Sequence, residues 1–171
     1  HVQEFKCGKP VAKVKKIGST KRRGTTISFH ADKTIFDTLD FNWKYIVDHL
    51  RQQAYLTKGV KVTIVDSRSE EEKKADKTAG EFTTNSYQFY FEGGIKSYVK
   101  HINKNKEPKH ENVFYIEKRV EHILVELALQ YTDDYSENLF AFANNITNPD
   151  GGTHVAGFHA ALTRTLNTYA R

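Results

Sequence analysis

The feature that most constrains the fold of this chain is a change of apolar periodicity near residue 59. Apolar residues first recur at the spacing of one helix face, at Trp43, Ile46, Val47, Leu50 and Ala54. After Gly59, a residue suited to end a helix, they alternate instead at Val60, Val62 and Ile64. The pattern predicts a helix capped by Asp40 and a strand over 60–65, and therefore a mixed α+β fold.

Three short strands are expected before that helix, over 2–6, 11–16 and 25–30. The third shows the clearest alternation, because Thr25, Ile27 and Phe29 fall on one face. Turn residues between the strands favour antiparallel pairing of close neighbours. Residues 1–66 are therefore predicted to form a sheet with a helix on one face.

A charged and polar segment without apolar periodicity follows at 67–86. This composition is typical of a linker or an insertion, and we place a domain boundary there. The remaining residues, 87–171, are predicted to form a second domain that also mixes helices and strands.

Four strands are predicted in the second domain, over 87–91, 113–116, 122–131 and 138–143. The last two are expected to pair with each other, and Gly93-Gly94 to separate the first from a helix over 95–102. The chain closes with a helix for which Thr153 is the expected cap. The apolar face of this helix is predicted to be buried: Val155, Phe158, Leu162, Leu166 and Tyr169.

Composition narrows the class of protein. With 38% hydrophobic and 27% charged residues, the chain is expected to be soluble and globular rather than disordered or a coiled coil. No apolar run approaches the roughly 20 residues of a membrane-spanning helix. Cys7 is the only cysteine, which excludes an intramolecular disulfide and suits a cytoplasmic protein. The chain contains no Met and starts at His1, so we expect it to be a piece of a longer polypeptide.

Positive charge is concentrated in the first part of the chain. The net charge is +5, but residues 1–66 carry 13 basic against 6 acidic residues, whereas 67–171 carry 13 against 15. The densest cluster consists of Lys13, Lys15, Lys16, Lys21, Arg22 and Arg23. Two interpretations stay open, because such a cluster either follows the phosphates of a nucleic acid or forms a solvated hairpin whose lysines prevent edge aggregation.

Common catalytic and metal-binding motifs are absent from the sequence, which has neither a phosphate-binding glycine loop nor two histidines at metal-ligand spacing. The most distinctive string runs from Asn144 to His154 and enters the last helix. It fits either an anion site at a helix N-terminus or a tight turn before a capped helix. The polar side of that helix, which carries His159 and Arg164, faces either DNA or water.

Four strings of the sequence resemble the ATPase subunits of bacterial type IIA DNA topoisomerases, gyrase B and the B subunit of topoisomerase IV. They are GTTISF at 24–29, LRQQAYLTKGVKVTIVD at 50–66, FEGGIKSYVKHINKNKEPKH at 91–110 and NNITNPDGGTHVAGFHAALTRTLNTYAR at 144–171. Together they extend through most of the chain, and the last is the most specific. The FEGGI string and the loop after it are more similar to gyrase B than to its sister.

The resemblance implies an architecture and an activity for the whole subunit. Residues 1–66 would be the C-terminal half of a GHKL-type ATPase domain, an α/β sandwich, and 87–171 the first half of a transducer domain with a ribosomal-protein-S5-like fold. The subunit would bind ATP and Mg²⁺, dimerise on binding ATP, and couple ATP hydrolysis to DNA strand passage and negative supercoiling. Its partners would be double-stranded DNA and a gyrase A-type subunit, with which it would form an A2B2 heterotetramer. No membrane partner is expected.

Few residues of the family's ATP site match this chain. The resemblance implies that Thr25 helps to hold the adenine through water and that Ile27 lines the adenine pocket. It places the catalytic Glu, the magnesium-binding Asn and the glycine-rich lid before His1, and the phosphate-binding Lys of the switch loop after Arg171. The chain alone, with no catalytic or metal-binding residue of its own, is therefore expected not to hydrolyse ATP.

The last helix would face the cavity that holds the transported DNA. The resemblance makes Arg164 a candidate DNA contact, and it places His159 where the family usually has an Arg, so that the permanent charge is lost there. The alternative function is a stand-alone nucleic-acid-binding module with an S5-like fold that uses basic residues 13–23. Salt-dependent DNA binding by the isolated chain would support this alternative.

Overall fold

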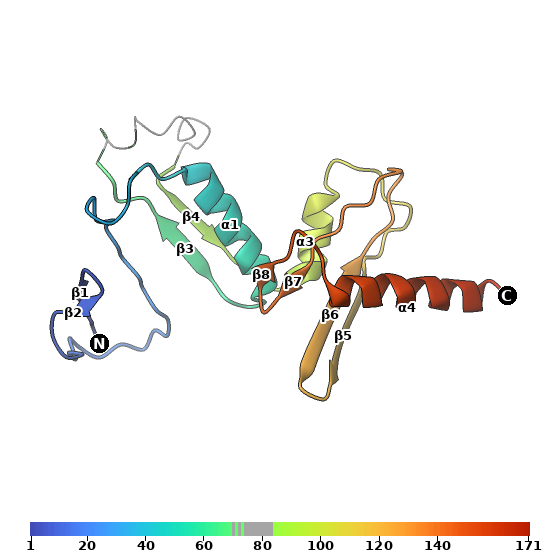
Figure 1. The fold of residues 1–171 in the computed structure, drawn as a ribbon, viewed down its shortest axis with the longest axis horizontal. Coiled ribbons are helices and arrows are strands. Elements are labelled where there is room, and N and C mark those ends of the chain that lie inside the picture. The colour runs from blue at the N-terminus through green and yellow to red at the C-terminus, as the bar shows by residue number, and fades with distance from the viewer. Residues whose placement is uncertain (70, 72, 74–83) are drawn as a thin grey trace. The chain divides into compact units, whose positions relative to one another are not determined.

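Figure 1 shows the chain as a computed structural model, which describes residues 1–69, 71, 73 and 84–171. Helices and strands are mixed along the chain, which confirms the predicted α+β class. The chain divides into two compact units, an N-terminal unit, His1–Phe41, and a main unit, Asn42–Arg171.

The N-terminal unit contains one short hairpin. β1 (Phe5–Lys6) and β2 (Lys9–Pro10) pair in antiparallel fashion. Cys7 and Gly8 form the turn with φ angles of 49° and 75°, the left-handed conformation that a two-residue hairpin turn requires. The antiparallel direction expected for residues 2–16 is confirmed, but regular pairing is much shorter than predicted, with one isolated bridge from Val2 to Lys15 beyond it.

The strand predicted over 25–30 is wrong. Residues 25–30 form no strand in the structure, and Ile27 and Phe29 expose 82% and 75% of their surface. Alternation creates an apolar face, but a strand also needs a partner for its backbone N–H and C=O groups. No segment of the N-terminal unit pairs with 25–30.

The main unit begins with α1 (Trp43–Leu56), and its cap is Asn42 rather than the predicted Asp40. The Asn42 side chain accepts a 2.8 Å hydrogen bond from the backbone N–H of Tyr45, three residues on. This is the spacing at which a side chain satisfies an unpaired N–H group of the first helical turn, and Asp40 lies two residues too early for it. At the other end the chain reverses at Gly59, whose φ is 78°, in agreement with the expected stop.

The core of the main unit lies between α1 and a two-stranded sheet. β3 (Val62–Val65) pairs antiparallel with β4 (Ser86–Phe89), as Figure 1 shows beside α1. Trp43, Val47, Ala54 and Phe89 are buried there, and Val62, Ile64, Tyr87 and Phe91 pack against them. The helical stripe and the alternating strand predicted from the sequence therefore meet in one core.

The segment predicted as a linker, 67–86, connects two strands that pair with each other. Its residues 70, 72 and 74–83 lie outside the described part of the chain. On both sides of them the pairing continues, because the backbone N–H of Asp66 donates to the carbonyl of Asn85 at 2.8 Å. Arg68 also holds Asp66 with a bidentate contact, and this contact lowers the pKa of the Asp66 carboxyl.

α3 (Gly94–Ile102) follows the first sheet directly. Gly94 is buried and has a φ of 53°, and a Cβ at this position would lie 3.4 Å from the Cβ of Lys58 at the end of α1. The predicted break at Gly93-Gly94 is confirmed. Its second glycine is the one that the backbone conformation requires, because a side chain is unfavourable at positive φ.

The strand over 122–131 is paired differently from the prediction. β6 (Ile123–Leu129) pairs with β5 (Phe114–Val120) in a seven-residue antiparallel hairpin, rather than with 138–143. Glu121, with a φ of 53°, occupies the turn between them. This turn was not predicted from the sequence, because neither Glu121 nor His122 is among the residues that usually mark a hairpin turn.

Residues 138–143 take part in a second, shorter hairpin. Within them, β7 (Phe142–Ala143) pairs with β8 (Ile146–Thr147). Asn144 and Asn145 form the turn with φ angles of 49° and 64°. Asn tolerates the left-handed region better than most residues, so this string is a hairpin turn rather than part of the entry into the last helix.

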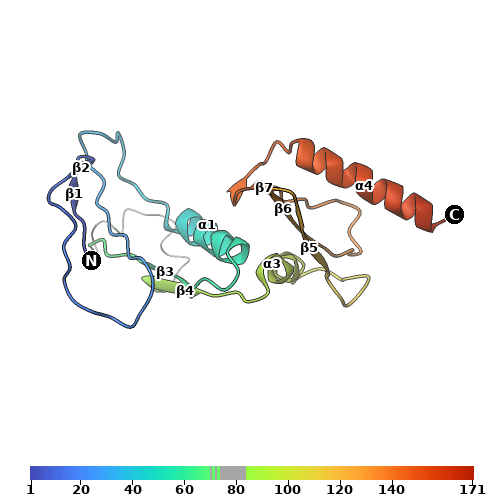
Figure 2. The same cartoon turned by 90° about the horizontal axis from the view of Figure 1, so that it is seen from below.

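α4 (Thr153–Tyr169) ends the chain, and Figure 2 shows it extending to the C-terminus. The predicted cap is wrong, because Gly152 occupies the cap position, Thr153 is the first helical residue, and no side chain caps the helix. The predicted buried face is also wrong. None of its residues is buried, and Leu166 and Tyr169 expose 49% and 91% of their surface. An apolar stripe becomes buried only where another element covers it.

Candidate functional site

The most highly organised side-chain cluster of the main unit lies between α1 and α3. The ring of Tyr55 stacks on Phe91 with a centroid separation of 3.6 Å and on Tyr98 with one of 5.1 Å. Tyr55 is buried, and this burial raises the pKa of its phenol. Aromatic pairs of this kind add stability beyond their buried area, so the stack holds the two helices together.

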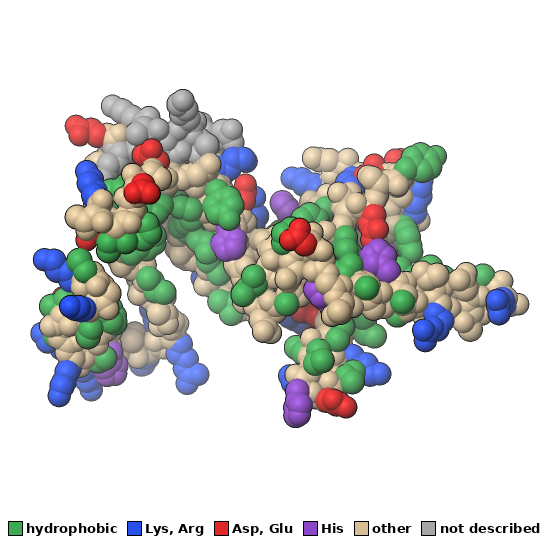
Figure 3. Space-filling model, viewed as in Figure 1, with side chains coloured by type: hydrophobic (Ala, Val, Ile, Leu, Met, Phe, Trp, Pro, Cys, Tyr) green, Lys and Arg blue, Asp and Glu red, His purple; other side chains and the backbone are tan. Residues whose placement is uncertain are grey.

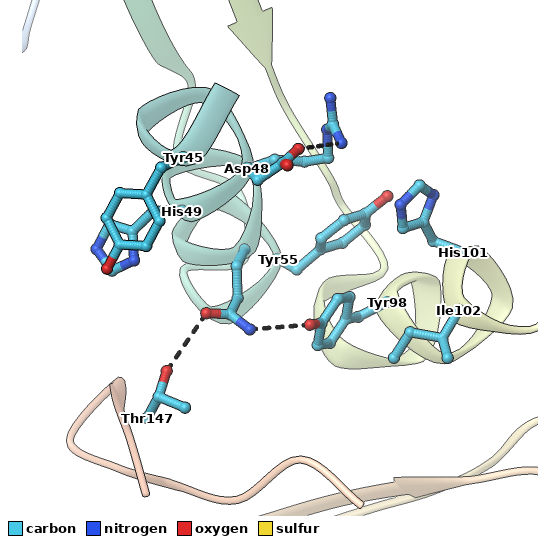
Figure 4. A pocket seen from close by; sticks show the side chains of 10 residues that line it. Tyr45, Asp48, His49, Tyr55, Tyr98, His101, Ile102 and Thr147 are labelled. Atoms are coloured by element: carbon cyan, nitrogen blue, oxygen red, sulfur yellow. Dashed lines mark hydrogen bonds and ion pairs between the residues drawn. The ribbon is translucent and has the colours of Figure 1, made fainter. Parts of the chain in front are cut away.

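Gln52 joins three segments of the main unit. Its amide Nε2 donates a 2.9 Å hydrogen bond to the hydroxyl of Tyr98 on α3, and its Oε1 accepts a 3.3 Å bond from the hydroxyl of Thr147 on β8. Figure 4 shows both bonds as dashed lines that meet at one side chain. The neighbouring Gln53 donates a 3.0 Å bond to the carbonyl of Asn145 in the β7–β8 turn. We call Gln52, Tyr98 and Thr147 the glutamine network.

A cavity of about 560 Å³ opens beside the glutamine network. Figure 4 shows its side chains, which come mainly from α1 and α3. Tyr45 and His49 stack in parallel at 6.1 Å on one side of it. The lining is mixed aromatic and polar, and within it Asp48 pairs with Arg51 at 2.9 Å.

Charge at this site is balanced on α1. Asp48 contacts both Lys44, at 3.6 Å, and Arg51, and the Arg51 guanidinium lies 5.4 Å from the ring centroid of Phe89. The Arg side chain thus connects the helix surface to the core below it. The imidazoles of His49 and His101 also line the cavity, and they contact the rings of Tyr45 and Tyr55. Because Gln52 connects three segments by hydrogen bonds, the arrangement is suited to transmitting position between them.

The predicted ATP-site residues belong to the other compact unit. Thr25 and Ile27 both lie in the N-terminal unit and are exposed. The two side chains alone do not enclose an adenine ring. Among the described residues, no three His, Cys, Asp or Glu side chains gather in one place.

The two predicted DNA-binding residues lie on α4. Arg164 is exposed, and its side chain has no acidic partner in the described ranges. His159 Nε2 lies 3.6 Å from Glu137 Oε1, a contact that becomes an ion pair when the imidazole is protonated. Arg164 therefore presents a permanent charge to solvent, whereas Glu137 would offset the charge of His159.

A second polar cluster lies on the β5–β6 hairpin. Glu117 is directly opposite Glu126, and the Tyr115 hydroxyl contacts both carboxylates, at 2.8 and 2.9 Å. Like charges that face each other across a hairpin destabilise it, and the shared phenol offsets this repulsion. Partial burial, followed by the two carboxylate bonds, raises the pKa of Tyr115.

The residues that form the glutamine network were not predicted from the sequence. A Gln on a helix surface has no pattern that distinguishes it from a solvated residue, and Tyr98 was predicted only as a residue of the helix over 95–102. Only the tertiary structure shows that α3 and β8 contact the face of α1 that carries Gln52.

Within the described residues, no helix is long and apolar enough to cross a bilayer.

Comparisons with known proteins identify the relatives of this chain. The DNA gyrase B family model matches residues 94–171. Over its entire length the chain is 41% identical to the DNA gyrase B protein of Halalkalibacterium halodurans, of which it covers 25%. It is 44% identical over 98% of its length to the gyrase B protein of Staphylococcus epidermidis, of which it covers 24%. The expected resemblance is thus confirmed, and the chain spans about a quarter of the length of these relatives.

Solved structures agree with the sequence relatives. The 43K ATPase domain of Thermus thermophilus gyrase B, solved with an aminocoumarin, superposes on 81% of this chain with a TM-score of 0.65 and 29% identity, and the match covers 34% of that domain. The gyrase B protein of Myxococcus xanthus covers 95% of this chain with a TM-score of 0.70; at 20% identity, with 44% of that protein matched, it shows the fold alone. The fold expected from the resemblance is confirmed.

Proposed function

We propose that this chain, a relative of DNA gyrase B proteins along its whole length, is the segment that joins the ATP-binding part of such a protein to its transducer. The whole protein would use ATP and Mg²⁺ in the cytoplasm. It would dimerise when ATP binds, and would act with a gyrase A-type subunit on double-stranded DNA. The observation that carries the proposal is the glutamine network, which links α1 to α3 and β8.

We place the join at Tyr90–Gly93, between β4 and α3. Two observations support this position. β4 pairs with β3, so that α1 and these two strands share one core, and the DNA gyrase B family model begins at Gly94, the first residue of α3. Under this assignment the ATPase part continues past the predicted boundary at 67–86, and the transducer starts with α3.

The contacts at the join are of the kind that transmit displacement. Tyr55 is stacked between Phe91 and Tyr98, and packed aromatic cores resist compression. Gln52 satisfies one partner on α3 and one on β8, so that a rotation of α1 would break both bonds or carry both segments with it. Each such bond stabilises the join by about 1 kcal/mol.

The nucleotide and DNA contacts of the chain would be supporting ones. Thr25 and Ile27 would contact adenine once the rest of the ATPase part covers them, and Arg164 and His159 on α4 would contact DNA. We propose that ATP hydrolysis needs the rest of the ATPase part, which would supply the general base and the metal ligands.

The test replaces Gln52 in the full-length gyrase B protein that contains this segment. With the gyrase A protein present, Gln52→Ala should lower the number of supercoils introduced per ATP hydrolysed by about fivefold or more, because two bonds across the join are removed. ATP affinity should stay unchanged, because Gln52 is not placed at the nucleotide. Supercoiling of plasmid and ATP turnover are measured on the same preparation.

Gln88→Ala is the matched control, since Gln88 is an exposed residue of the same type on β4 with no contact across the join. It should leave the ratio of supercoils to ATP unchanged. A Gln52→Ala protein that keeps the normal ratio, or that loses ATPase and supercoiling in equal proportion, would contradict a coupling role for the glutamine network.

A further inference from the structure

The net positive charge of the chain is confined to the N-terminal unit. That unit has nine basic and four acidic residues, whereas the main unit has 17 of each, so the whole net charge of +5 belongs to residues 1–41. Within it, residues 5–31 contain eight basic residues and no acidic one. We call these eight the basic cluster: Lys6, Lys9, Lys13, Lys15, Lys16, Lys21, Arg22 and Arg23.

All eight side chains are solvent-exposed and none is neutralised within the described residues. Each lies at an exposed position, and no carboxylate of the described ranges forms an ion pair with any of them. Figure 3 shows Lys and Arg side chains gathered over the N-terminal unit. Solvated lysines are common, but eight basic residues with no acidic residue among them produce a positive electrostatic potential along the whole segment.

The hairpin holds two of these charges face to face. Lys6 lies directly opposite Lys9 in the β1–β2 register, an arrangement that costs stability. The chain has a second like-charge pair across a hairpin, Glu117 and Glu126, and there the Tyr115 hydroxyl contacts both. Among the described residues, no group contacts both Lys6 and Lys9 and offsets their repulsion. Their missing counter-charge must come from solvent or from a ligand.

We infer that the basic cluster is a docking surface for the sugar-phosphate backbone of duplex DNA. A long, exposed run of Lys and Arg without acidic partners binds most favourably to regularly spaced phosphates. Each contact with a phosphate releases a condensed counterion, and this release favours binding. The relatives of this chain are DNA gyrase proteins, which favours DNA over other polyanions. Binding is independent of base sequence, since the cluster offers only charge.

This inference goes beyond the proposed function, which needs the join between α1 and α3 and assigns DNA contacts to α4. The basic cluster belongs to the other compact unit and includes no residue of the glutamine network. Failure of one proposal therefore leaves the other standing.

The experiment measures binding of the complete 171-residue chain to a fluorescent duplex by anisotropy, from about 50 to 200 mM salt. The first variant carries Lys13→Gln, Lys15→Gln and Lys16→Gln. We expect DNA affinity to fall roughly tenfold or more, and the slope of log K against log salt to become shallower by about 3, one for each phosphate that is no longer neutralised. Two duplexes of different sequence should bind equally.

The matched control removes the same charge elsewhere, with Lys96→Gln, Lys100→Gln and Lys104→Gln, three exposed lysines of the main unit. It should retain most of the affinity and the slope. Circular dichroism verifies that both triple variants keep their helices, all of which lie in the main unit.

Four results would overturn the inference. One is no salt-dependent binding to DNA, and another is an equal loss in the two triple variants, which would make net charge rather than position the cause. The third is binding by the chain to phosphatidylserine–phosphatidylcholine vesicles but not to DNA, which would make the cluster a membrane surface. If Arg164→Gln abolishes DNA binding while the Lys13, Lys15 and Lys16 variant binds normally, the surface lies on α4 and the basic cluster is not part of it.

Discussion

The N-terminal unit and the first half of the main unit use the same apolar alternation with opposite results. Val62 and Ile64 alternate on β3 and pack against the buried residues of α1 and β4. Thr25, Ile27 and Phe29 alternate as regularly, yet the two apolar members are exposed. The difference is the presence of a pairing strand and a covering helix in the main unit. Alternation alone specifies a face, and burial needs a second layer.

The N-terminal unit and the main unit also differ in how their charges are compensated. The main unit is neutral overall, and several of its ionised side chains are paired, for example Asp48 with Arg51 and Lys106 with Asp134. The N-terminal unit leaves the basic cluster without acidic partners. A region that buries its apolar residues and pairs its charges is stable by itself, whereas a region that does neither depends on what it contacts.

The largest contrast is expected from truncating one apolar residue in each region. Trp43 is 5% exposed, so Trp43→Ala should lower the free energy of unfolding by about 3–5 kcal/mol, whereas Ile27→Ala should change it by less than about 0.5 kcal/mol. Urea unfolding followed by far-ultraviolet circular dichroism measures both. Similar losses for the two variants would show that Ile27 is covered in solution and would remove the contrast.

An intermediate effect is expected at the start of α3. Gly94→Ala should cost about 1–2 kcal/mol, because Gly94 has a φ of 53° and a Cβ is unfavourable in the left-handed region. Gly93→Ala is the matched control. Its φ is −78°, and the added Cβ would clash with the Ser97 hydroxyl, which can rotate away, while the Ser97 Cβ and backbone N lie at 3.4 and 3.7 Å. Unfolding midpoints in urea compare the two, and equal losses would mean that close packing rather than backbone conformation requires the glycines.

The smallest effect is a pH dependence at the β5–β6 hairpin. The pKa of Tyr115 is raised above its ordinary value of 10.0 in the folded chain, so the phenol stabilises the fold fully below about pH 10. That contribution is lost as the pH rises from there through the folded pKa. Tyr115→Phe lacks it, so the stability difference between the two proteins should shrink above about pH 10.

Urea midpoints of the parent chain and Tyr115→Phe, taken below and above about pH 10, measure this difference. The other eight tyrosines and the lysines titrate in both proteins and cancel. A difference that stays constant across this range would indicate that Tyr115 does not hold its proton between Glu117 and Glu126.

Elements whose pattern is local were predicted well, and those that depend on a distant partner were not. The helix over Trp43–Leu56 and the break at Gly93-Gly94 follow from spacing and backbone chemistry within a few residues. The pairing of Ile123–Leu129 was assigned to the wrong strand, because the turn at Glu121 carries no residue that marks it. The burial of α4 was overestimated, since its stripe does not reveal whether anything covers it.

The sequence by itself determined the α+β class, the gyrase B relationship, the helix of the core and the uneven distribution of charge. Each of these depends only on composition or on the pattern of residues close together in the chain. Only the tertiary structure decided that β4 returns to pair with β3 and that Gln52 reaches both Tyr98 and Thr147. It also decided that residues 25–30 pair with no strand of the described part of the chain. Contacts between residues far apart in the chain depend on how layers are stacked, and the energy of stacking belongs to pairs of elements rather than to either one.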